Sequence, residues 1–578
     1  MRGHRLIRRA ANLGRPALPR PPRRPASVRA LSEALSAHAA AWLLVLAAPL
    51  AMAQGEPAAA AQGEPPGQGA LLWLDASGHP LPAARTALHW LESAHQQGLD
   101  PQDYDSAALA QALQQAETQP LAPEPARQLD AALTQQVLRY LHALRHGRVD
   151  PARLRAHYDS PAAPAPDLRA ALHSAVAEGR LDAALHAALP PWPQYQALQQ
   201  ALVHYQRLEA ESAWHSPLPA LPGGRLVAGQ RWAGLATLAA RLHALGDLPE
   251  PAPAPVNYDA TLQRAVRAFQ TRHALAADGV VGKPTLEALN VTPAARARQI
   301  ALAMERLRLT PLPEAARFIT VNVPEFMLRA YDHRGAPPQQ AMAMRVIVGK
   351  ALDTRTPLFD ADLQWIEFSP YWNIPPSIAR SETVPKLRAN PGYLASQGME
   401  FVGPGGQVST AVTPELLDAV LAGQWRIRQR PGPRNALGDV KFVMPNNQAI
   451  YLHHTPSVGL FNRLRRDFSH GCVRVEEPVA LAEWLLQNEP AWTAARIRDA
   501  MAKPRPVTAR LSGPVPVLML YQTAVAEADG VHFVPDVYGQ DALLTQALRQ
   551  ASRPPSPAAA PQARVQRRAG TSEFVAAQ

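Results

Sequence analysis

The single cysteine of the chain stands among residues that could turn its thiol into a nucleophile. Cys472 lies in the run SHGCVR over 469–474, and His453 comes nineteen positions earlier. A thiol with an ordinary pKa near ~8.5 is mostly protonated at neutral pH, and an imidazole within reach can take its proton and later return it to a leaving amine. The residues therefore predict Cys472 as nucleophile and His453 as general base, with a buried inert cysteine as the alternative.

Three neighbours fit the same chemistry. Gly471 would permit the tight backbone that lets the Cys472 N–H face a developing oxyanion. Tyr451 lies two residues before His453, so on one face of a strand its hydroxyl could add a second donor. Arg474 would share the face of Cys472 if that segment is extended, and its charge would stabilise a thiolate or hold a substrate carboxylate.

A metallohydrolase built from His453, His454 and His470 is a weaker alternative. Adjacent histidines of a strand point to opposite faces, and the sequence has no HExxH motif or carboxylate partner at metal-ligand spacing. One cysteine in 578 residues also excludes an internal disulfide framework and any multi-cysteine metal site. We therefore predict no cofactor and no metal.

The elements that must position these residues form a β-rich domain over 313–550. Ile319, Val321 and Val323 alternate with polar residues. Further runs rich in β-branched and aromatic residues follow at 345–348, 364–368, 441–444, 449–452, 515–521 and 531–534. The more helical and loop-like stretch at about 376–438 is predicted to be an insertion between strands that forms a lid over the site.

Two helical units precede that domain. Residues 71–225 predict an α-helical domain, in which Val137, Tyr140, Leu141 and Leu144 form one face of a helix that Gly147 could end. Residues 230–292 predict three short helices around one small core, with proline in the first turn of the third. The chain is thus expected to be multidomain.

Both ends of the chain are predicted to lie outside the folded domains. Residues 1–53 combine nine arginines with an uncharged run, Ala39–Ala53, that is too short to span a bilayer and ends in a small-x-small motif. This is typical of a signal peptide cleaved after Ala53; an uncleaved segment would instead anchor the chain in the inner membrane. We expect 54–70 to be a linker and 551–578 a disordered tail.

The net charge of +11 is located in these two ends of the chain. Residues 1–53 carry +8 and the tail from Ser552 carries +3, so the remaining chain is neutral. A basic footprint for nucleic acid is therefore absent from the part expected to fold.

Two stretches resemble known families. The string YDATLQRAVRAFQTRHALAADGVVGKPTLEALN resembles the three-helix peptidoglycan-binding domain over nearly its whole length. The segment YLHHTPSVGLFNRLRRDFSHGCVRVEEP resembles the active-site stretch of the L,D-transpeptidases, a histidine followed at about this distance by Ser/Thr-His-Gly-Cys. MRVIVGKALDTRTPLF and FSPYWNIPPSI also resemble that family, specifically its larger Gram-negative branch with a scaffold domain, a peptidoglycan-binding domain and a lid.

The resemblance implies a periplasmic enzyme of cell-wall biogenesis and cell shape. Cys472 would attack the bond between diaminopimelate and D-alanine of a tetrapeptide donor stem, and an amine of an acceptor stem would resolve the thioester into a 3-3 crosslink. Peptidoglycan stem peptides are then the substrates, other cell-wall synthesis proteins are further candidate partners, and carbapenems would acylate the cysteine. An L,D-carboxypeptidase or crosslink-cleaving hydrolase using the same residues, and a wall-binding scaffold with a dead site, are the alternatives.

The resemblance also assigns roles to single residues. It places the nucleophile on Cys472, the base on His453, and the oxyanion environment on Gly471, Cys472 and Tyr451. Substrate contacts fall on Arg474, Ser469, His470 and Trp372, with an aromatic core residue as the alternative for Trp372. His454 departs from the family pattern, which leaves open the group that orients His453; a backbone carbonyl could serve.

Overall fold

The computed structural model describes residues 71–158, 167–250, 255–334 and 337–551. The predicted signal peptide, the linker and, apart from its first residue, the C-terminal tail lie outside the described residues. Within the described part of the chain, no helix has both the length and the apolar character needed to cross a bilayer.

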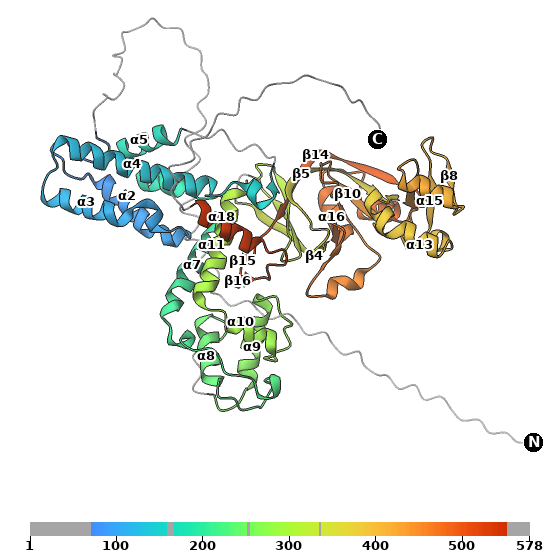
Figure 1. The fold of residues 1–578 in the computed structure, drawn as a ribbon, viewed down its shortest axis with the longest axis horizontal. Helices are drawn as coiled ribbons and strands as arrows, with labels where there is room; N and C mark the ends of the chain where they lie inside the picture. The colour runs from blue at the N-terminus through green and yellow to red at the C-terminus, as the bar shows by residue number, and fades with distance from the viewer. Residues whose placement is uncertain (1–70, 159–166, 251–254, 335–336, 552–578) are drawn as a thin grey trace, which may run out of the picture. The chain divides into compact units, whose positions relative to one another are not determined.

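The first described region is helical. Its helices are α2 (Pro82–Glu92), α3 (Ser106–Thr118), α4 (Pro123–His146), α5 (Leu168–Ala177), α6 (Leu181–Ala187) and α7 (Pro193–Arg207) (Figure 1). The predicted apolar stripe of α4 is buried, and Gly147 caps the helix with a positive φ of 71°. The buried Trp73 indole donates to Thr134 of α4 at 2.8 Å, which ties the start of the region to its longest helix.

A three-helix unit follows, shown in green in Figure 1. It contains α8 (Leu235–Ala244), α9 (Ala260–Arg272) and α10 (Lys283–Leu289). Leu238, Val266 and Phe269 are buried in one core. The turn before α10 is held by the buried Tyr258 hydroxyl, which donates to the carbonyl of Gly279 at 2.7 Å.

Helix α11 (Pro293–Leu309) connects this unit to the β-rich domain and contacts α4, α7 and α18 (Gln540–Ala551). Its Glu305 is fully buried and pairs with Arg308 at 2.8 Å, while the Arg148 N–H donates to the same carboxylate at 2.5 Å. Burial alone would raise the pKa of Glu305, yet the two arginines hold it below its ordinary value. The carboxylate is therefore charged and needs both partners.

The β-rich domain is one sheet that closes on itself. Its strands are β2 (Arg317–Asn322), β3 (Met327–Asp332), β4 (Gln339–Gly349), β5 (Leu358–Phe368), β10 (Val440–Val443), β11 (Leu452–His453), β13 (Val473–Val475) and β14 (Val507–Leu520). The order is β5-β10-β11-β13-β4-β3-β2-β14, and β14 pairs back with β5. Two short strands add to it, β1 (Ala156–His157) beside β5 and β12 (Asp467–Ser469) beside β4.

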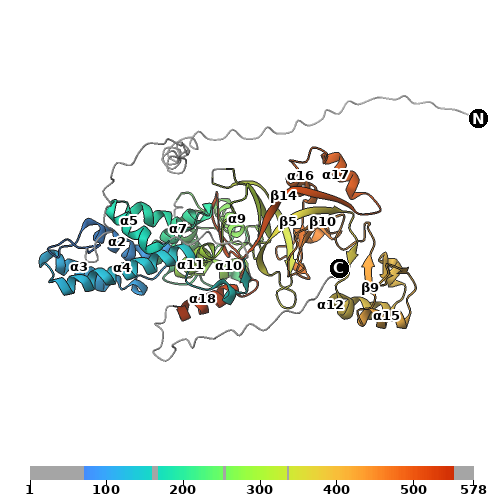
Figure 2. The ribbon, with the colours of Figure 1, turned by 90° about the horizontal axis from the view of Figure 1, so that it is seen from above.

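Alternation along these strands fills the interior of the closed sheet. Ile366, Phe442, Leu452 and Val473 come from four neighbouring strands and belong to one buried core. Because successive side chains point to opposite faces, the residues between them lie on the outer face. Helices α16 (Pro478–Leu485) and α17 (Ala494–Met501) pack on each other beside this sheet (Figure 2). The hairpin of β15 (Ala524–Glu527) and β16 (Gly530–Phe533) precedes α18.

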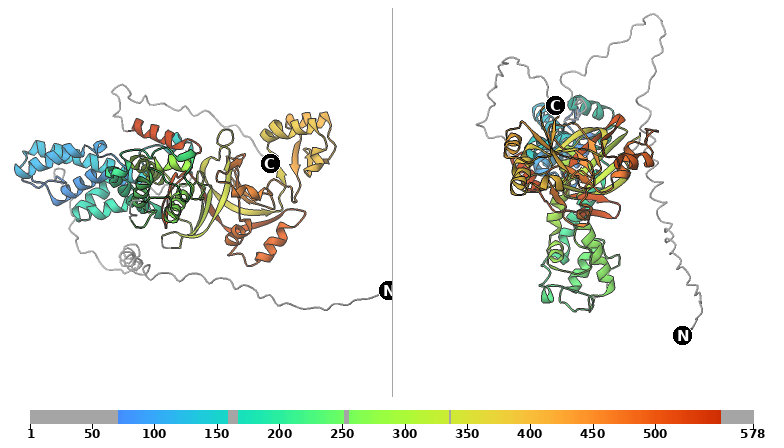
Figure 3. Two further views of the ribbon diagram at one scale, coloured as in Figure 1. Left: turned by 90° about the horizontal axis from the view of Figure 1, so that it is seen from below. Right: turned by 90° about the vertical axis from the view of Figure 1, so that its right-hand side faces the viewer.

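The insertion forms a small unit of its own between β5 and β10. It holds α12 (Pro376–Ile378), α13 (Val384–Ala389), α14 (Tyr393–Ser396) and α15 (Pro414–Leu421), together with the sheet β6 (Trp372–Asn373), β9 (Arg426–Gln429), β7 (Met399–Val402) and β8 (Val408–Ser409). These elements stay grouped in both views of Figure 3, in yellow and light orange, around a core that includes Leu387, Phe401 and Ile427. The helical and loop-like description missed this sheet, whose strands are too short to show an alternating pattern.

Another sequence prediction was wrong in detail. The strand expected at 449–452 begins only at Leu452. Ala449 has a positive φ of 54°, and the Asn446 side chain donates to the carbonyls of Met444 and Ile450, so the chain turns there instead of extending. The predicted fold class is otherwise confirmed: a helical region, a three-helix unit and a β-rich domain.

Glu305→Gln should destabilise the folded chain by about 3 to 5 kcal/mol, because it leaves the buried Arg308 without its counter-charge. Calorimetric unfolding of the full chain would measure the loss. The matched control is Glu287→Gln, whose side chain is exposed and pairs with Lys283 only at 3.9 Å. Equal melting profiles for the two variants would contradict the buried-pair argument.

Candidate active site

Strand pairing brings the cysteine and histidine segments together. β11 and β13 run parallel, with Leu452 opposite Val473 and His453 opposite Arg474. The ladder continues one step outward, where the Val473 N–H donates to the carbonyl of Tyr451 at 3.1 Å. Tyr451 and Cys472 are therefore neighbours on the two adjacent strand segments, as His453 and Arg474 are.

A row of ionisable side chains crosses the outer face of the sheet at this point. Glu367 of β5 is opposite Lys441 of β10, Lys441 is opposite His453, and His453 is opposite Arg474. Directly opposed residues of neighbouring strands share a face. Since the residues on either side of them fill the core, the row lies outside the closed sheet, next to the inserted unit.

The turn that carries Cys472 is held by its own residues. Gly471 has a φ of 119°, a conformation in which any side chain would be strained. Ser469 donates to the carbonyl of Cys472 at 2.5 Å and accepts the Gly471 N–H at 3.1 Å. Ser469 is 2% exposed, so the structure offers no free surface for the substrate contact predicted for it; its hydroxyl holds the turn instead.

A second support comes from residues that the sequence analysis did not single out. The buried Thr356 hydroxyl accepts the Gly349 N–H at 2.9 Å and donates to the Gly471 carbonyl at 2.7 Å. The Tyr538 hydroxyl donates to the Gly349 carbonyl at 2.6 Å. Gly349 cannot carry a side chain, because a Cβ would lie 1.9 Å from the carbonyl oxygen of Thr354. Thr356 thus joins β4 to the turn of the nucleophile.

The thiol of Cys472 is surrounded by donors. The backbone N–H and the hydroxyl of Tyr451 both bond its sulfur, and the thiol makes a long contact of 3.7 Å to the Ala449 carbonyl. Burial raises the pKa of Cys472, and these bonds and the charges of Lys441 and Arg474 oppose that rise. Because the pKa of Cys472 is raised, its thiol is protonated at neutral pH.

His453 is buried and oriented by its own neighbour. Its Nδ1 lies 2.5 Å from the carbonyl oxygen of His454, which accepts the Nδ1 proton, and the backbone of Leu437 also hydrogen-bonds the ring. Burial and the charge of Arg474 lower the pKa of His453 to about 3. The ring is therefore neutral at neutral pH, as a general base must be.

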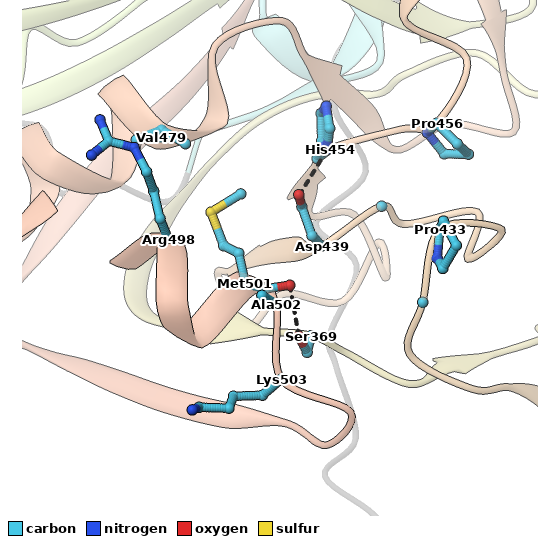
Figure 4. Close-up of a pocket in the computed structure, with 12 residues that line it drawn as sticks. Ser369, Pro433, Asp439, His454, Pro456, Val479, Arg498, Met501, Ala502 and Lys503 are labelled. Atoms are coloured by element: carbon cyan, nitrogen blue, oxygen red, sulfur yellow. Dashed lines mark hydrogen bonds and ion pairs between the residues drawn. The ribbon is translucent and has the colours of Figure 1, made fainter. Parts of the chain in front are cut away.

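The residue after the base has a fixed position too. His454 Nδ1 lies 2.7 Å from a carboxylate oxygen of Asp439, and the His454 N–H donates to the Val440 carbonyl at 3.0 Å. Both bonds hold the carbonyl that orients His453. A cavity of about 500 Å³ lies beside this pair (Figure 4), lined by Asp439, His454 and Met501 among others and by none of the predicted catalytic residues.

Arg474 is a half-buried cation with an unused donor. Its Nε is buried and has no hydrogen-bond partner among the described residues. Burial lowers the pKa of Arg474. A buried guanidinium donor without a partner is costly, so it marks a place where an anionic group could bind.

The inserted unit touches the site at two points. The Trp372 side chain hydrogen-bonds the Tyr451 hydroxyl and also packs against the core of the insertion. His470 Nε2 lies 2.6 Å from a carboxylate oxygen of Glu382, in the segment between α12 and α13. Trp372 therefore lies both at the predicted site and in the core of the insertion. The contact of His470 with Glu382 was not indicated by any sequence pattern.

The structure places Ser469, His470, Gly471 and Cys472 in one turn and Tyr451 and His453 on the neighbouring strand segment. Arg474 lies opposite His453, and Trp372 bonds Tyr451 from the insertion. No group of three or more histidine, cysteine, aspartate or glutamate side chains within the described ranges is arranged to hold a metal ion. The class that the fold and the site define is a closed β-domain with a cysteine–histidine pair on its outer face, next to an inserted unit.

Comparison with known families matches three stretches of the chain. Residues 67–202 match the scaffold domain, residues 233–289 the "Putative peptidoglycan binding domain" and residues 316–502 the L,D-transpeptidase catalytic domain. A curated protein of Haemophilus influenzae, named "Putative L,D-transpeptidase", is 35% identical over 240 residues, which is 42% of this chain and 48% of that protein. The chain thus aligns with about half the length of this relative.

Two solved structures that match the chain have much lower sequence identity. An L,D-transpeptidase from Stackebrandtia nassauensis is 12% identical, covering 53% of this chain and 97% of its own, with a TM-score of 0.20. A fused Zn-dependent amidase/peptidase/peptidoglycan-binding domain-containing protein from Clostridium acetobutylicum is 11% identical, covering 51% and 99%, with a TM-score of 0.15. The chain combines a scaffold domain, a peptidoglycan-binding domain and an L,D-transpeptidase catalytic domain, and these matches together with the curated relative support the L,D-transpeptidase family.

Thr356→Val should lower stability by about 1 to 3 kcal/mol and slow the reaction of Cys472 with an electrophile. It leaves the Gly349 N–H and the Gly471 carbonyl without their shared partner, and this loosens the turn of the nucleophile. Unfolding curves and the rate of iodoacetamide labelling would measure both effects. Thr356→Ser keeps the hydroxyl and should react like the parent chain; if it reacts as slowly as Thr356→Val, the hydroxyl is not the cause.

Proposed function

We propose that this chain is a peptidoglycan L,D-transpeptidase that forms 3-3 crosslinks through a thioester on Cys472. The observation that supports the proposal is the set of groups near that thiol: a neutral His453, two donors from Tyr451 to the sulfur, and Arg474, whose buried Nε has no partner among the described residues. A nucleophile, a base, oxyanion donors and an anion site are the four parts that acyl transfer needs.

The first half-reaction would transfer the donor stem to the enzyme. The sulfur of Cys472 attacks the carbonyl carbon between diaminopimelate and the terminal D-alanine, and its proton passes to Nε2 of His453. The Cys472 N–H and the Tyr451 hydroxyl stabilise the tetrahedral oxyanion. As the oxyanion collapses, the C–N bond breaks, D-alanine leaves with the proton from His453, and a thioester remains.

The second half-reaction would return the enzyme to its starting state. The side-chain amine of diaminopimelate on an acceptor stem attacks the thioester carbonyl and loses a proton to His453. The carbon–sulfur bond then breaks, the thiolate recovers the proton, and a new amide joins the two stems. Water in place of the amine would give a shortened tripeptide, so the outcome depends on how well the site excludes water.

Other features of the chain support the same role. The stems carry carboxylates that suit Arg474, and the peptidoglycan-binding domain would keep the catalytic domain on its polymer substrate. The inserted unit, which contacts Tyr451 through Trp372 and His470 through Glu382, would act as a lid that orders the donor. The predicted signal peptide implies a periplasmic location, where this substrate lies.

Expression in a host without L,D-transpeptidases, followed by muropeptide analysis, should reveal new 3-3 dimers. The Cys472→Ala chain, produced at the same level, should give none, because no other thiol is present. Tripeptides without 3-3 dimers would sink the transferase proposal in favour of an L,D-carboxypeptidase. Dimers from the Cys472→Ala chain would refute the nucleophile.

A carbapenem should form a stable covalent adduct with the purified chain. The strained β-lactam carbonyl resembles the donor carbonyl, so the same thiol would open it and retain the acyl group. Intact-protein mass spectrometry would show one added drug mass per chain, absent from Cys472→Ala. An adduct that survives in that variant would place acylation on another residue.

A further inference from the structure

Lys441 lies at the centre of the ionisable row and plays no part in the reaction as written above. It is directly opposite His453 on one side and Glu367 on the other. Ile366 and Phe442, the neighbours of Glu367 and Lys441 in sequence, point into the core, so the lysine stem lies on the outer face that also carries the site.

The ammonium group of Lys441 faces the tyrosine that contacts the nucleophile. Its Nζ lies 4.4 Å from the centroid of the Tyr451 ring, within the range of a cation–π contact. The same tyrosine bonds the sulfur of Cys472 through its hydroxyl and its backbone N–H. One cation therefore contacts the ring that carries the hydroxyl donor, and its charge also acts on the sulfur.

The electrostatics agree with this geometry. Hydrogen bonds from Tyr451 and the charges of Lys441 and Arg474 counter the rise that burial causes in the pKa of Cys472, and Lys441 contributes more than Arg474. Burial raises the pKa of Glu367 and Lys441 opposes that rise, so the carboxylate and the ammonium favour each other's charged forms. Along the row, Lys441 lies between Glu367 and His453, and His453 lies between Lys441 and Arg474.

The ionisable groups of the row and its neighbours come from several elements. Tyr451 and His453 come from the β11 segment, Arg474 from β13, Lys441 from β10 and Glu367 from β5. From the inserted unit, Glu382 faces the thiol's neighbour His470.

We propose that Lys441 is a positioning residue for the nucleophile: its ammonium group, which lies over the face of Tyr451 on the strand opposite Glu367, keeps the tyrosine hydroxyl on Cys472 and stabilises the thiolate. The inference rests on Cys472 being the nucleophile proposed above. It differs from that proposal because it concerns the state of the thiol before any stem peptide binds, so it can be tested without transpeptidation.

Iodoacetamide labelling of the full chain across pH 6 to 9.5 tests the idea, since the only thiol is Cys472. Lys441→Met keeps the aliphatic stem and removes the charge. Its labelling at pH 7.5 should be about tenfold slower than in the parent chain, with the whole rate profile moved to higher pH, because one charge near a partly buried thiol has an effect of this order. Lys441→Arg should restore labelling to within about threefold.

Glu367→Gln should change the labelling rate in the opposite direction. It removes the anion that offsets Lys441, so labelling at pH 7.5 should become faster, and this variant decides the question if Lys441→Met does not fold. Lys283→Met removes the same charge from an exposed side chain of the peptidoglycan-binding domain and should label like the parent.

Three results would overturn the proposal: an unmoved profile in a folded Lys441→Met chain, equal slowing by Lys441→Arg, or slower labelling of Glu367→Gln. Near-UV circular dichroism would establish that each variant is folded. Because labelling needs no substrate, failure of this proposal would leave the crosslinking result standing, and absence of 3-3 dimers would not alter the labelling profile.

Discussion

The parallel register of β11 with β13 is the constraint on which the site depends. It sets His453 opposite Arg474 and leaves Tyr451 beside Cys472, although nineteen positions separate the histidine from the cysteine. A slip of one residue would turn the base and the cation into the core and bring apolar side chains out. The buried Leu452 and Val473 prevent that slip, because they fill the closed sheet only in this register. Core packing thus positions the chemistry.

Burial of this site explains why the thiol of Cys472 and the ring of His453 are both uncharged at rest. Burial makes the thiol harder to ionise, and burial together with Arg474 lowers the pKa of His453 to about 3. A neutral thiol beside a neutral base avoids holding a buried ion pair without substrate. The fixed charges of Lys441 and Arg474 then favour the negative sulfur when the proton leaves. In the proposed reaction, the sulfur would become negative only when its proton is transferred.

Sequence reasoning identified the residues that carry local signals. The glycine before Cys472 and the distance from His453 are visible in the chain itself, and the period of two predicted a β-rich domain. Thr356, Lys441 and Glu382 could not be found in this way, because their roles arise from pairing between strands and from a contact with the insertion. The short strands β6 to β9 were missed for a similar reason: their pairing with one another, more than their own pattern, makes them strands.

The insertion is a small unit that contacts the neighbours of Cys472. Its own core, around Phe401 and Ile427, lets it keep its fold independently of the closed sheet. Its ends are joined where Asn435 donates to the Pro370 carbonyl at 2.9 Å, so it leaves and re-enters the catalytic domain at one place. Because Trp372 on this unit bonds Tyr451, any shift of the insertion would move a donor of the Cys472 sulfur. The position of the insertion and the hydrogen bonds to the thiol are therefore linked through Tyr451.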